Sequence, residues 1–317
     1  MLTFHKTVRQ RIGNVIVQYR LLNINEPVVI TFPPGSDGLT EQEAREGTAP
    51  WSYNFFTKQH KNIISFTHIG KDEYYRSIEL QNFVKYLGSN LTDFSERIGY
   101  GVSRGGFAVA LHANTLKLDR ALLMMPLSSY SAKVAPWDPK VLKAEKATQY
   151  CGYNNDGAEC KTPLTIIYDP LFKADRLHMQ RFRCEVHKLK ISGVGHRIAR
   201  TLRDLGLLKK IVLDFVDNKL DTENFPRLVK GRRELDFYHK TLCTNPTGKL
   251  TLKRKKVIYY HKVLWKLKHI EEEPRKIAKR LQESIQKRIS APQKLMLSSK
   301  NFIPAKMFVA SNFFVFC

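Results

Sequence analysis

The sequence predicts an α/β fold in which a mainly parallel β-sheet carries helices on both faces, and two observations support this. Short apolar or alternating runs recur between residues 15 and 191, separated by segments with helical spacing. Alternation of this kind is typical of βαβ units. In addition, an apolar strand, a tight glycine-rich turn and a helix follow one another directly over residues 97–113, RIGYGVSRGGFAVALHA.

The predicted strands are rich in β-branched or other apolar residues and end at turn-forming residues. In chain order they cover residues 15–22, 28–32, 63–69, 98–102, 120–125, 164–168 and 185–191. The last strand is the least apolar, so we expect it near an edge of the sheet. Helical spacing predicts helices over residues 77–91 and 198–215, and a buried helix directly after the glycine-rich turn.

The glycine-rich turn places Ser103 at the corner between a strand and a helix. Backbone at such a corner is strained, and neighbours with a Cβ would clash there. Gly101 and Gly105 relieve this crowding, while Gly106 lets the helix approach the sheet closely. The hydroxyl then projects at the positive end of the helix. A G-x-S-x-G in this strand-to-helix setting predicts a nucleophilic serine.

Two further reactive side chains follow predicted strand ends. Asp169 comes directly after the strand 164–168, and His196 lies in a glycine-containing loop after the last strand. The carboxyl ends of parallel strands meet at one edge of the sheet, where ligands bind. The glycine-rich turn at Ser103, called the elbow below, occurs together with reactive residues at strand ends in the order Ser, Asp, His. In these features the chain resembles the α/β-hydrolase superfamily, over about residues 10–217.

The resemblance implies that Ser103 is the nucleophile and that His196 takes and returns its proton. A carboxylate would orient the imidazole, and two are candidates. Asp169 is the first choice because it follows a strand, and Asp175 lies six residues further on. Each also has a structural alternative, since Asp169 precedes Pro170 and can initiate a turn, and Asp175 can cap a helix.

The resemblance further implies two backbone donors for an oxyanion. One is the N–H of Arg104, the residue after the nucleophile, and the other comes from the loop after the strand 28–32. Pro33 and Pro34 have no N–H, so Gly35 or Ser36 must supply it. The side chain of Arg104 either binds an anionic group of a substrate or reaches solvent.

Charge and pattern divide the chain into a catalytic domain, residues 1–217, and a basic helical C-terminal extension, residues 218–317. The extension holds 23 Lys and Arg against 8 Asp and Glu, within a chain of net charge +24. Its segment 271–288 has the spacing of an amphipathic helix. We expect a packed helical appendage, a contact with an anionic membrane surface, or nucleic-acid binding. Residues 127–163 are too long for a plain connection, and we interpret them as a cap insertion.

The sequence disfavours membrane-spanning, secreted, metal-binding and cofactor-binding proteins. The sequence has no run of about 18 apolar residues and no secretory signal at its start, so we expect a cytoplasmic protein, peripheral to the inner face of a membrane if it binds one. It has no metal-ligand spacing and no phosphate-binding loop, so we expect no metal and no cofactor.

The sequence therefore predicts either a serine hydrolase of the esterase or thioesterase kind, or an acyltransferase. In both cases we expect a small-molecule or acylated substrate, which can be anionic. The alternative is a non-catalytic hydrolase-fold protein that its basic extension recruits to a membrane or nucleic acid.

Overall fold

The computed structural model describes residues 2–70, 75–147, 156–235, 237–238, 251–268 and 282–283. Contacts divide the chain into one unit, Met1–Lys262, and a second, Val263–Cys317. The sheet and all sites discussed below belong to the first unit. Of the amphipathic helix predicted over residues 271–288, only 282 and 283 are among the described residues.

One sheet of eight strands forms the centre of the first unit, in the order β1-β2-β4-β3-β5-β6-β7-β8. The strands are β1 (Thr7–Ile12), β2 (Val15–Arg20), β3 (Val28–Phe32), β4 (Asn62–His68), β5 (Arg97–Val102), β6 (Arg120–Met124), β7 (Leu164–Tyr168) and β8 (Val186–Lys190). The pairs β1–β2 and β2–β4 are antiparallel, and all other pairs are parallel. The predicted α/β class with a mainly parallel sheet is confirmed, as is the edge position of the last strand.

Strand β1 was not among the strands predicted from the sequence. Its residues are exposed or half-buried, because it is an edge strand in which most side chains are polar. It forms a hairpin with β2 through Gly13 and Asn14, and Gly13 has a φ of +55°. A Gly-Asn pair between two alternating runs is a hairpin signal that identifies this strand.

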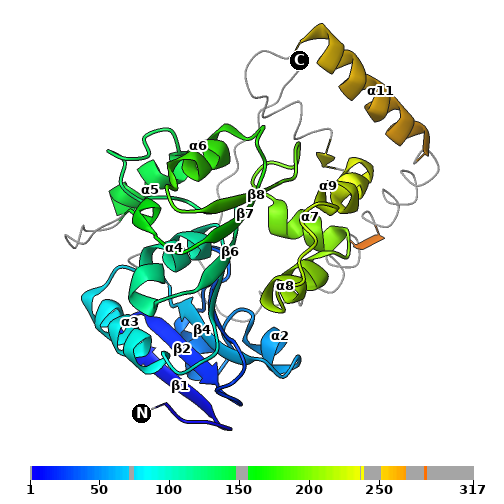
Figure 1. The fold of residues 1–317 in the computed structure, drawn as a ribbon. Helices are drawn as coiled ribbons and strands as arrows, with labels where there is room; N and C mark the ends of the chain where they lie inside the picture. Colours follow the sequence, from blue (N-terminus) through cyan, green and yellow to red (C-terminus); the bar gives the residue numbers. More distant parts are fainter. Residues whose placement is uncertain are drawn as a thin grey trace, which may run out of the picture. The chain divides into compact units, whose positions relative to one another are not determined.

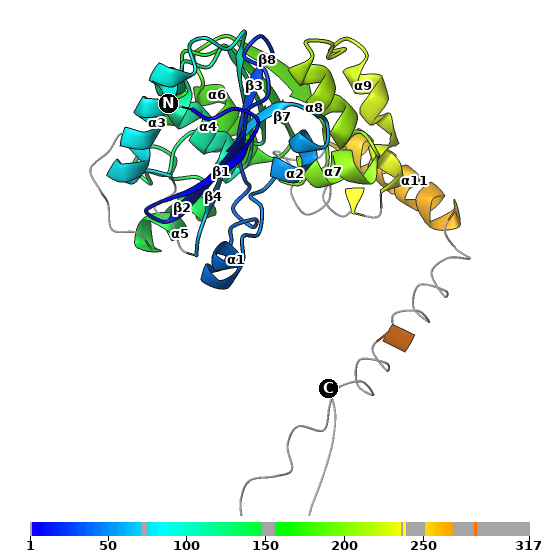
Figure 2. The same cartoon turned by 90° about the horizontal axis from the view of Figure 1, so that it is seen from below.

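Helices cover both faces of the sheet (Figures 1 and 2). One face is covered by α3 (Ile78–Asn90), α4 (Arg104–Leu116) and α6 (Lys173–Arg181), and the other by α2 (Tyr53–Thr57), α7 (Ile198–Asp204) and α8 (Leu208–Val216). The described residues also form the α-helices α1 (Glu41–Arg45), α5 (Pro139–Ala147), α9 (Phe225–Leu228) and α11 (Leu252–Lys268). Two 3₁₀ turns span Gly157–Glu159 and Val229–Glu234. Burial of these apolar helix faces on the sheet is the main stabilising term of the fold.

The single helix predicted over residues 198–215 is two helices, α7 and α8. The break lies at Gly206, whose φ of +71° ends α7 in the left-handed conformation that glycine adopts without strain. The N–H of Leu207 then donates to the carbonyl of Leu202, which satisfies the end of α7. The glycine signals this break in the sequence.

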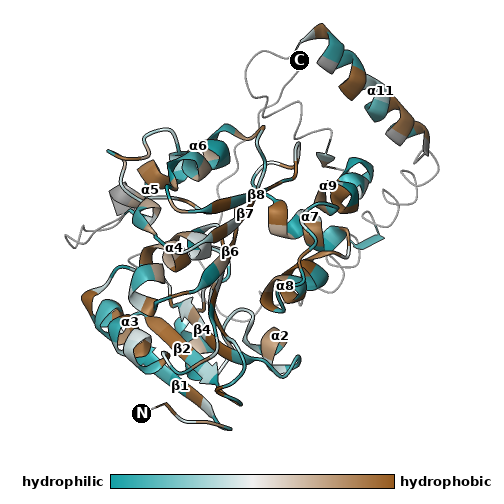
Figure 3. Cartoon of the chain, in the orientation of Figure 1, coloured by the Kyte–Doolittle hydropathy of each residue, from teal (hydrophilic) through white to brown (hydrophobic). Residues whose placement is uncertain are grey.

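The chain continues past residue 217 within the same compact unit. Phe225, Val229, Tyr238 and Ile258 are buried in the cluster that also packs on β5 and β6. The division predicted at residue 218 stays a prediction. The contacts place the end of the first unit at Lys262. The described part of the predicted extension includes α11, which carries hydrophilic and hydrophobic residues along its length (Figure 3).

Part of the 127–163 insertion lies in a hydrophobic cluster separate from the two clusters on the sheet. Its buried members include Leu127, Tyr130 and Val141, packed against Phe107 of α4. The insertion is therefore attached to the helix that begins at the elbow. Its role as a cap stays a prediction.

None of the helices in the described ranges is long and apolar enough to cross a bilayer.

The contact between α3 and α4 makes a prediction in which two effects oppose each other. Alanine in place of Gly88 gains about 1 kcal/mol in helix propensity. However, a Cβ at Gly88 would lie 1.9 Å from the carbonyl oxygen of Thr115, which belongs to the backbone of α4. Overpacking of this kind costs about 3 kcal/mol, so we expect Gly88→Ala to lower the free energy of unfolding by about 2 kcal/mol.

Urea denaturation measures this difference. The control is Ser89→Ala at the exposed neighbouring position, for which we expect unchanged or slightly higher stability. A Gly88→Ala variant that is more stable than the wild type contradicts the packing.

Candidate active site

Ser103 lies at a strained corner between β5 and α4. Its backbone has φ 53° and ψ −110°, a conformation that is rare for a residue with a side chain. The corner is held on both sides. The N–H of Ser103 donates to the carbonyl of Met124 on β6 at 2.9 Å, and its own carbonyl accepts the N–H of Phe107 at 3.1 Å. The serine thus projects from the carboxyl end of the central strands.

Close approach of the backbone explains the glycines around Ser103. A Cβ at Gly105 would lie 2.0 Å from the carbonyl oxygen of Phe32 at the end of β3. One at Gly101 would lie 2.4 Å from the carbonyl oxygen of Gly105, and one at Gly106 would lie 2.9 Å from the Cβ of Pro126. Each of the three positions therefore excludes a larger side chain, as the sequence pattern predicts.

A continuous hydrogen-bond chain runs from Ser103 through His196 to a carboxylate. The Ser103 Oγ lies 2.8 Å from His196 Nε2, and His196 Nδ1 lies 2.6 Å from Asp175 Oδ1. An ionised carboxylate only accepts, so Nδ1 carries the proton and Nε2 is left to accept from the serine hydroxyl. Asp175 is 3% exposed and His196 is 18% exposed, so the imidazole can reach solvent while its carboxylate partner cannot.

Asp169, the first choice for the carboxylate, is not the hydrogen-bond partner of the His196 imidazole in the structure. Its Oδ2 accepts the N–H groups of Gly193 at 2.9 Å and Gly195 at 2.7 Å, and its Oδ1 accepts that of Leu171 at 2.8 Å. The order of preference between the two candidates is therefore reversed. Asp169 initiates a turn, as its alternative interpretation predicts, and it also shapes the loop that carries His196.

Burial raises the pKa of Asp169, which is 1% exposed. The three backbone N–H donors lower this pKa, and the nearby charge of Asp175 raises it. The two carboxylates thus lie close to one another but have different partners: Asp169 holds backbone, and Asp175 holds the imidazole.

The backbone donors predicted for an oxyanion lie in neighbouring segments. Arg104 is the first residue of α4, where N–H groups point out of the helix end. Gly35 and Ser36 are the central residues of a turn closed by the N–H of Asp37 donating to the carbonyl of Pro34 at 3.0 Å. That bond does not use the N–H of either central residue. A Cβ at Gly35 would lie 3.0 Å from the Nε of Arg104, so the turn packs against residue 104.

The Arg104 side chain extends to β4. Its Nη1 lies 3.4 Å from Nε2 of His68, which is 3% exposed. The side chain is partly exposed, so both roles expected for it, binding an anionic group and reaching solvent, stay predictions. Its positive charge lies on the residue next to Ser103.

A second polar network, which sequence reasoning missed, joins the insertion to α6. Nδ1 of His178 accepts the N–H of Ser128 at 3.0 Å, and its Nε2 lies 3.1 Å from Oδ2 of Asp138. Arg181 adds bonds to Ser128 Oγ and to Asp156. Ser128 and His178 are at most 1% exposed, so this part of the network is closed to a substrate.

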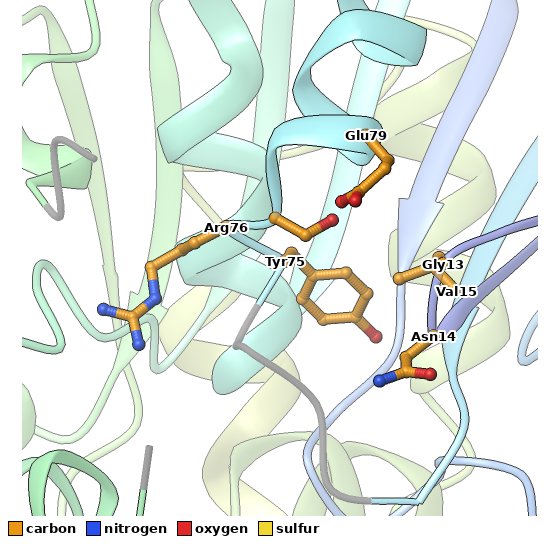
Figure 4. A pocket seen from close by; sticks show the side chains of 7 residues that line it. Gly13, Asn14, Val15, Tyr75, Arg76 and Glu79 are labelled. Carbon is orange, nitrogen blue, oxygen red and sulfur yellow. The ribbon is translucent and has the colours of Figure 1, made fainter. Parts of the chain in front are cut away.

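Two pockets lie away from Ser103 and His196. One, of about 480 Å³, lies between α2 and α8, with Trp51, Phe55 and Leu208 among its walls. The other, of about 150 Å³, lies between the β1–β2 turn and the start of α3. Figure 4 shows the Arg76 side chain of this second pocket extending away from Glu79 and Asn14. Among the described residues, no group of three His, Cys, Asp or Glu side chains is arranged to hold a metal ion.

No protein-family model matches the chain, and no curated protein sequence matches it. Solved structures similar to it include the capsule O-acetyltransferase of Neisseria meningitidis serogroup A, at 14% identity and a TM-score of 0.47, covering 66% of this chain and 94% of that one. Another is a putative hydrolase from Bacillus subtilis, at 12% identity and a TM-score of 0.42, covering 66% and 91%. A third is EstE1, a thermophilic carboxylesterase cloned from a metagenomic library, at 11% identity and a TM-score of 0.40, covering 71% and 88%.

The features of this chain itself carry the fold assignment. They are the eight-stranded sheet with its antiparallel β2, the strained serine corner between β5 and α4, and the histidine loop after β8. With these features, the chain has an α/β-hydrolase fold.

Proposed function

We propose that the protein catalyses acyl transfer through an acyl-enzyme formed on Ser103. The observation that carries this proposal is the chain of hydrogen bonds from Ser103 Oγ to His196 and from His196 to Asp175, at 2.8 and 2.6 Å. A nucleophile, a base within hydrogen-bond reach and a group that orients the base are the three elements of nucleophilic catalysis by serine.

In the first half-reaction, His196 Nε2 takes the hydroxyl proton as Ser103 Oγ attacks the carbonyl carbon of the substrate. The resulting oxyanion accepts hydrogen bonds from the N–H of Arg104 and from that of Gly35 or Ser36. Asp175 stabilises the imidazolium. The tetrahedral intermediate then collapses, and His196 returns the proton to the leaving group, which leaves the acyl group on Ser103.

In the second half-reaction, an acceptor gives its proton to His196 and attacks the carbonyl carbon of the acyl-enzyme. The bond from that carbon to Ser103 Oγ then breaks, and His196 returns the proton to Ser103 Oγ. Water as the acceptor makes the protein an esterase or thioesterase, and an alcohol makes it an acyltransferase. The positive side chain of Arg104 beside the nucleophile favours an acylated substrate with an anionic group. The proposed chemistry needs no cofactor. A separate prediction is that the basic extension, residues 218–317, recruits the protein to an anionic membrane surface or to nucleic acid.

Labelling with a fluorophosphonate probe tests the nucleophile. We expect the purified wild type to be labelled, and Ser103→Ala and His196→Ala to lose the label, because the first lacks the attacking oxygen and the second lacks its base. Ser89→Ala, at an exposed serine, is the matched control and keeps the label. Absence of label on folded wild type contradicts the proposal and favours the non-catalytic, binding alternative. If Ser103→Ala is still labelled, the labelled nucleophile is a residue other than Ser103.

Stability and labelling rate, measured together, distinguish the roles of the carboxylates of Asp175 and Asp169. We expect Asp175→Asn to fold with near-native stability but to label roughly 10³- to 10⁴-fold more slowly, because the amide no longer orients the imidazole. Asp169→Asn puts an amide NH₂ against backbone N–H groups, so we expect it to lower the free energy of unfolding by about 1–3 kcal/mol. Thermal unfolding and labelling kinetics measure both. Normal labelling of Asp175→Asn argues against its role.

A further inference from the structure

The pocket of about 480 Å³ lies between α2 and α8, on the face of the sheet that these helices cover (Figures 1 and 2). Trp51 and Phe55 form its α2 side, Leu208 and Val212 form its α8 side, and Tyr100 of β5 lines it from the sheet. Within each helical pair the residues are four positions apart, so they lie on one face. A pocket of this volume is large enough for a small organic ligand.

The walls of this pocket are apolar but incompletely covered. Trp51, Phe55 and Leu208 pack against the core cluster of this face, yet each remains partly exposed. Large apolar side chains gathered around a recess are typical of a ligand site. A ligand with an apolar body gains free energy by removing these side chains from water.

Tyr100 supplies a polar group to the pocket. It is 4% exposed, and its ring lies 5.2 Å from that of Trp51 and 6.4 Å from that of Phe56. Its hydroxyl makes no hydrogen bond within the part of the chain that the structure describes. Burial raises the pKa of this hydroxyl, so it stays protonated and can donate to an occupant. A few polar groups set in apolar walls are what orients a ligand in such a pocket.

Two cationic side chains line the same pocket at the junction of α7 and α8. Arg203 and Lys209 flank Gly206, and both are exposed. Among the described residues, neither side chain makes a hydrogen bond or an ion pair. The acidic residues of these two helices are paired with other cations, Asp204 with Arg200 at 3.8 Å and Asp214 with Lys210 at 2.6 Å. The mouth of an apolar pocket thus carries positive charge that is available to an anion.

We propose that this pocket is a second ligand site, which binds a single-chain fatty acid. The alkyl chain lies between α2 and α8, and the carboxylate lies at Arg203 and Lys209. An alkyl chain needs no stacking geometry, so it suits a pocket with aromatic rings on one side and aliphatic side chains on the other. Ser103 and His196 are not among the lining residues, and the inference does not depend on the proposed acyl transfer.

Calorimetric titration of the full chain with dodecanoate, below the concentration at which it forms micelles, tests the site. We expect saturable one-to-one binding. Dodecanol has the same chain without the charge, so we expect it to bind more weakly than dodecanoate.

The double variant Arg203→Gln/Lys209→Gln tests whether the cations bind the carboxylate. We expect it to weaken dodecanoate binding roughly three- to tenfold and to leave dodecanol binding unchanged, because exposed charge pairs contribute modestly. The matched control is Arg200→Gln/Lys210→Gln, which removes the same charge from the same two helices outside the pocket lining. We expect the control to bind both ligands as the wild type does.

Leu208→Trp tests the place of the alkyl chain, because the larger side chain fills the pocket. We expect this variant to lose binding of both ligands, and thermal unfolding verifies that each variant is folded. If Leu208→Trp does not fold, the two charge variants still decide the question.

Three results overturn the inference. They are absence of dodecanoate binding to the folded wild type, an equal loss in the two charge variants, and undiminished binding to folded Leu208→Trp. If labelling of Ser103 with a fluorophosphonate abolishes binding that Leu208→Trp retains, the acid binds at the acyl-transfer site, and the inference is also wrong. Failure of the wild type to label contradicts the proposed function but leaves this pocket unaffected.

Discussion

The close approach of α4 to the ends of β3 and β5 is the constraint on which the site depends. With a carbonyl oxygen of β3 only 2.0 Å from where a Cβ of Gly105 would lie, the helix can start there only if that residue is glycine. This contact fixes the direction in which the chain leaves β5, and Ser103 takes up the resulting strain with a positive φ. The serine is held rigidly at the helix end, where both the field and the N–H groups favour a developing negative charge.

The carboxylates of Asp169 and Asp175 have different structural roles, because their surroundings differ. Asp169 is surrounded by backbone N–H groups, and it fixes the two glycines that let the chain turn toward His196. Asp175 lies on the first turn of α6, where the helix, and not the strand end, sets its direction. The position of the imidazole therefore depends on both: one carboxylate shapes the loop, and the other holds the ring. The insertion affects this arrangement because its buried network attaches to α6.

Local signals predicted most of the fold and part of the site. The strand runs, the elbow glycines and the strand-end positions of Asp169 and His196 depend on nearby residues, so they are readable in the sequence. The partner of His196 is not, because Asp169 and Asp175 differ only in which way a turn and a helix direct them. The network of His178 joins residues 40 and 50 positions apart, which periodicity cannot show. Strand β1 was missed because an edge strand need not be apolar.

The most direct test of the account is the proton NMR signal of the His196 Nδ1–H. A short hydrogen bond from this group to a buried carboxylate shifts its proton far downfield. The account predicts a far-downfield signal in the wild type that is absent from His196→Ala and from Asp175→Asn. A signal of His196 that persists in Asp175→Asn contradicts it, because the imidazole would then be held by some other group.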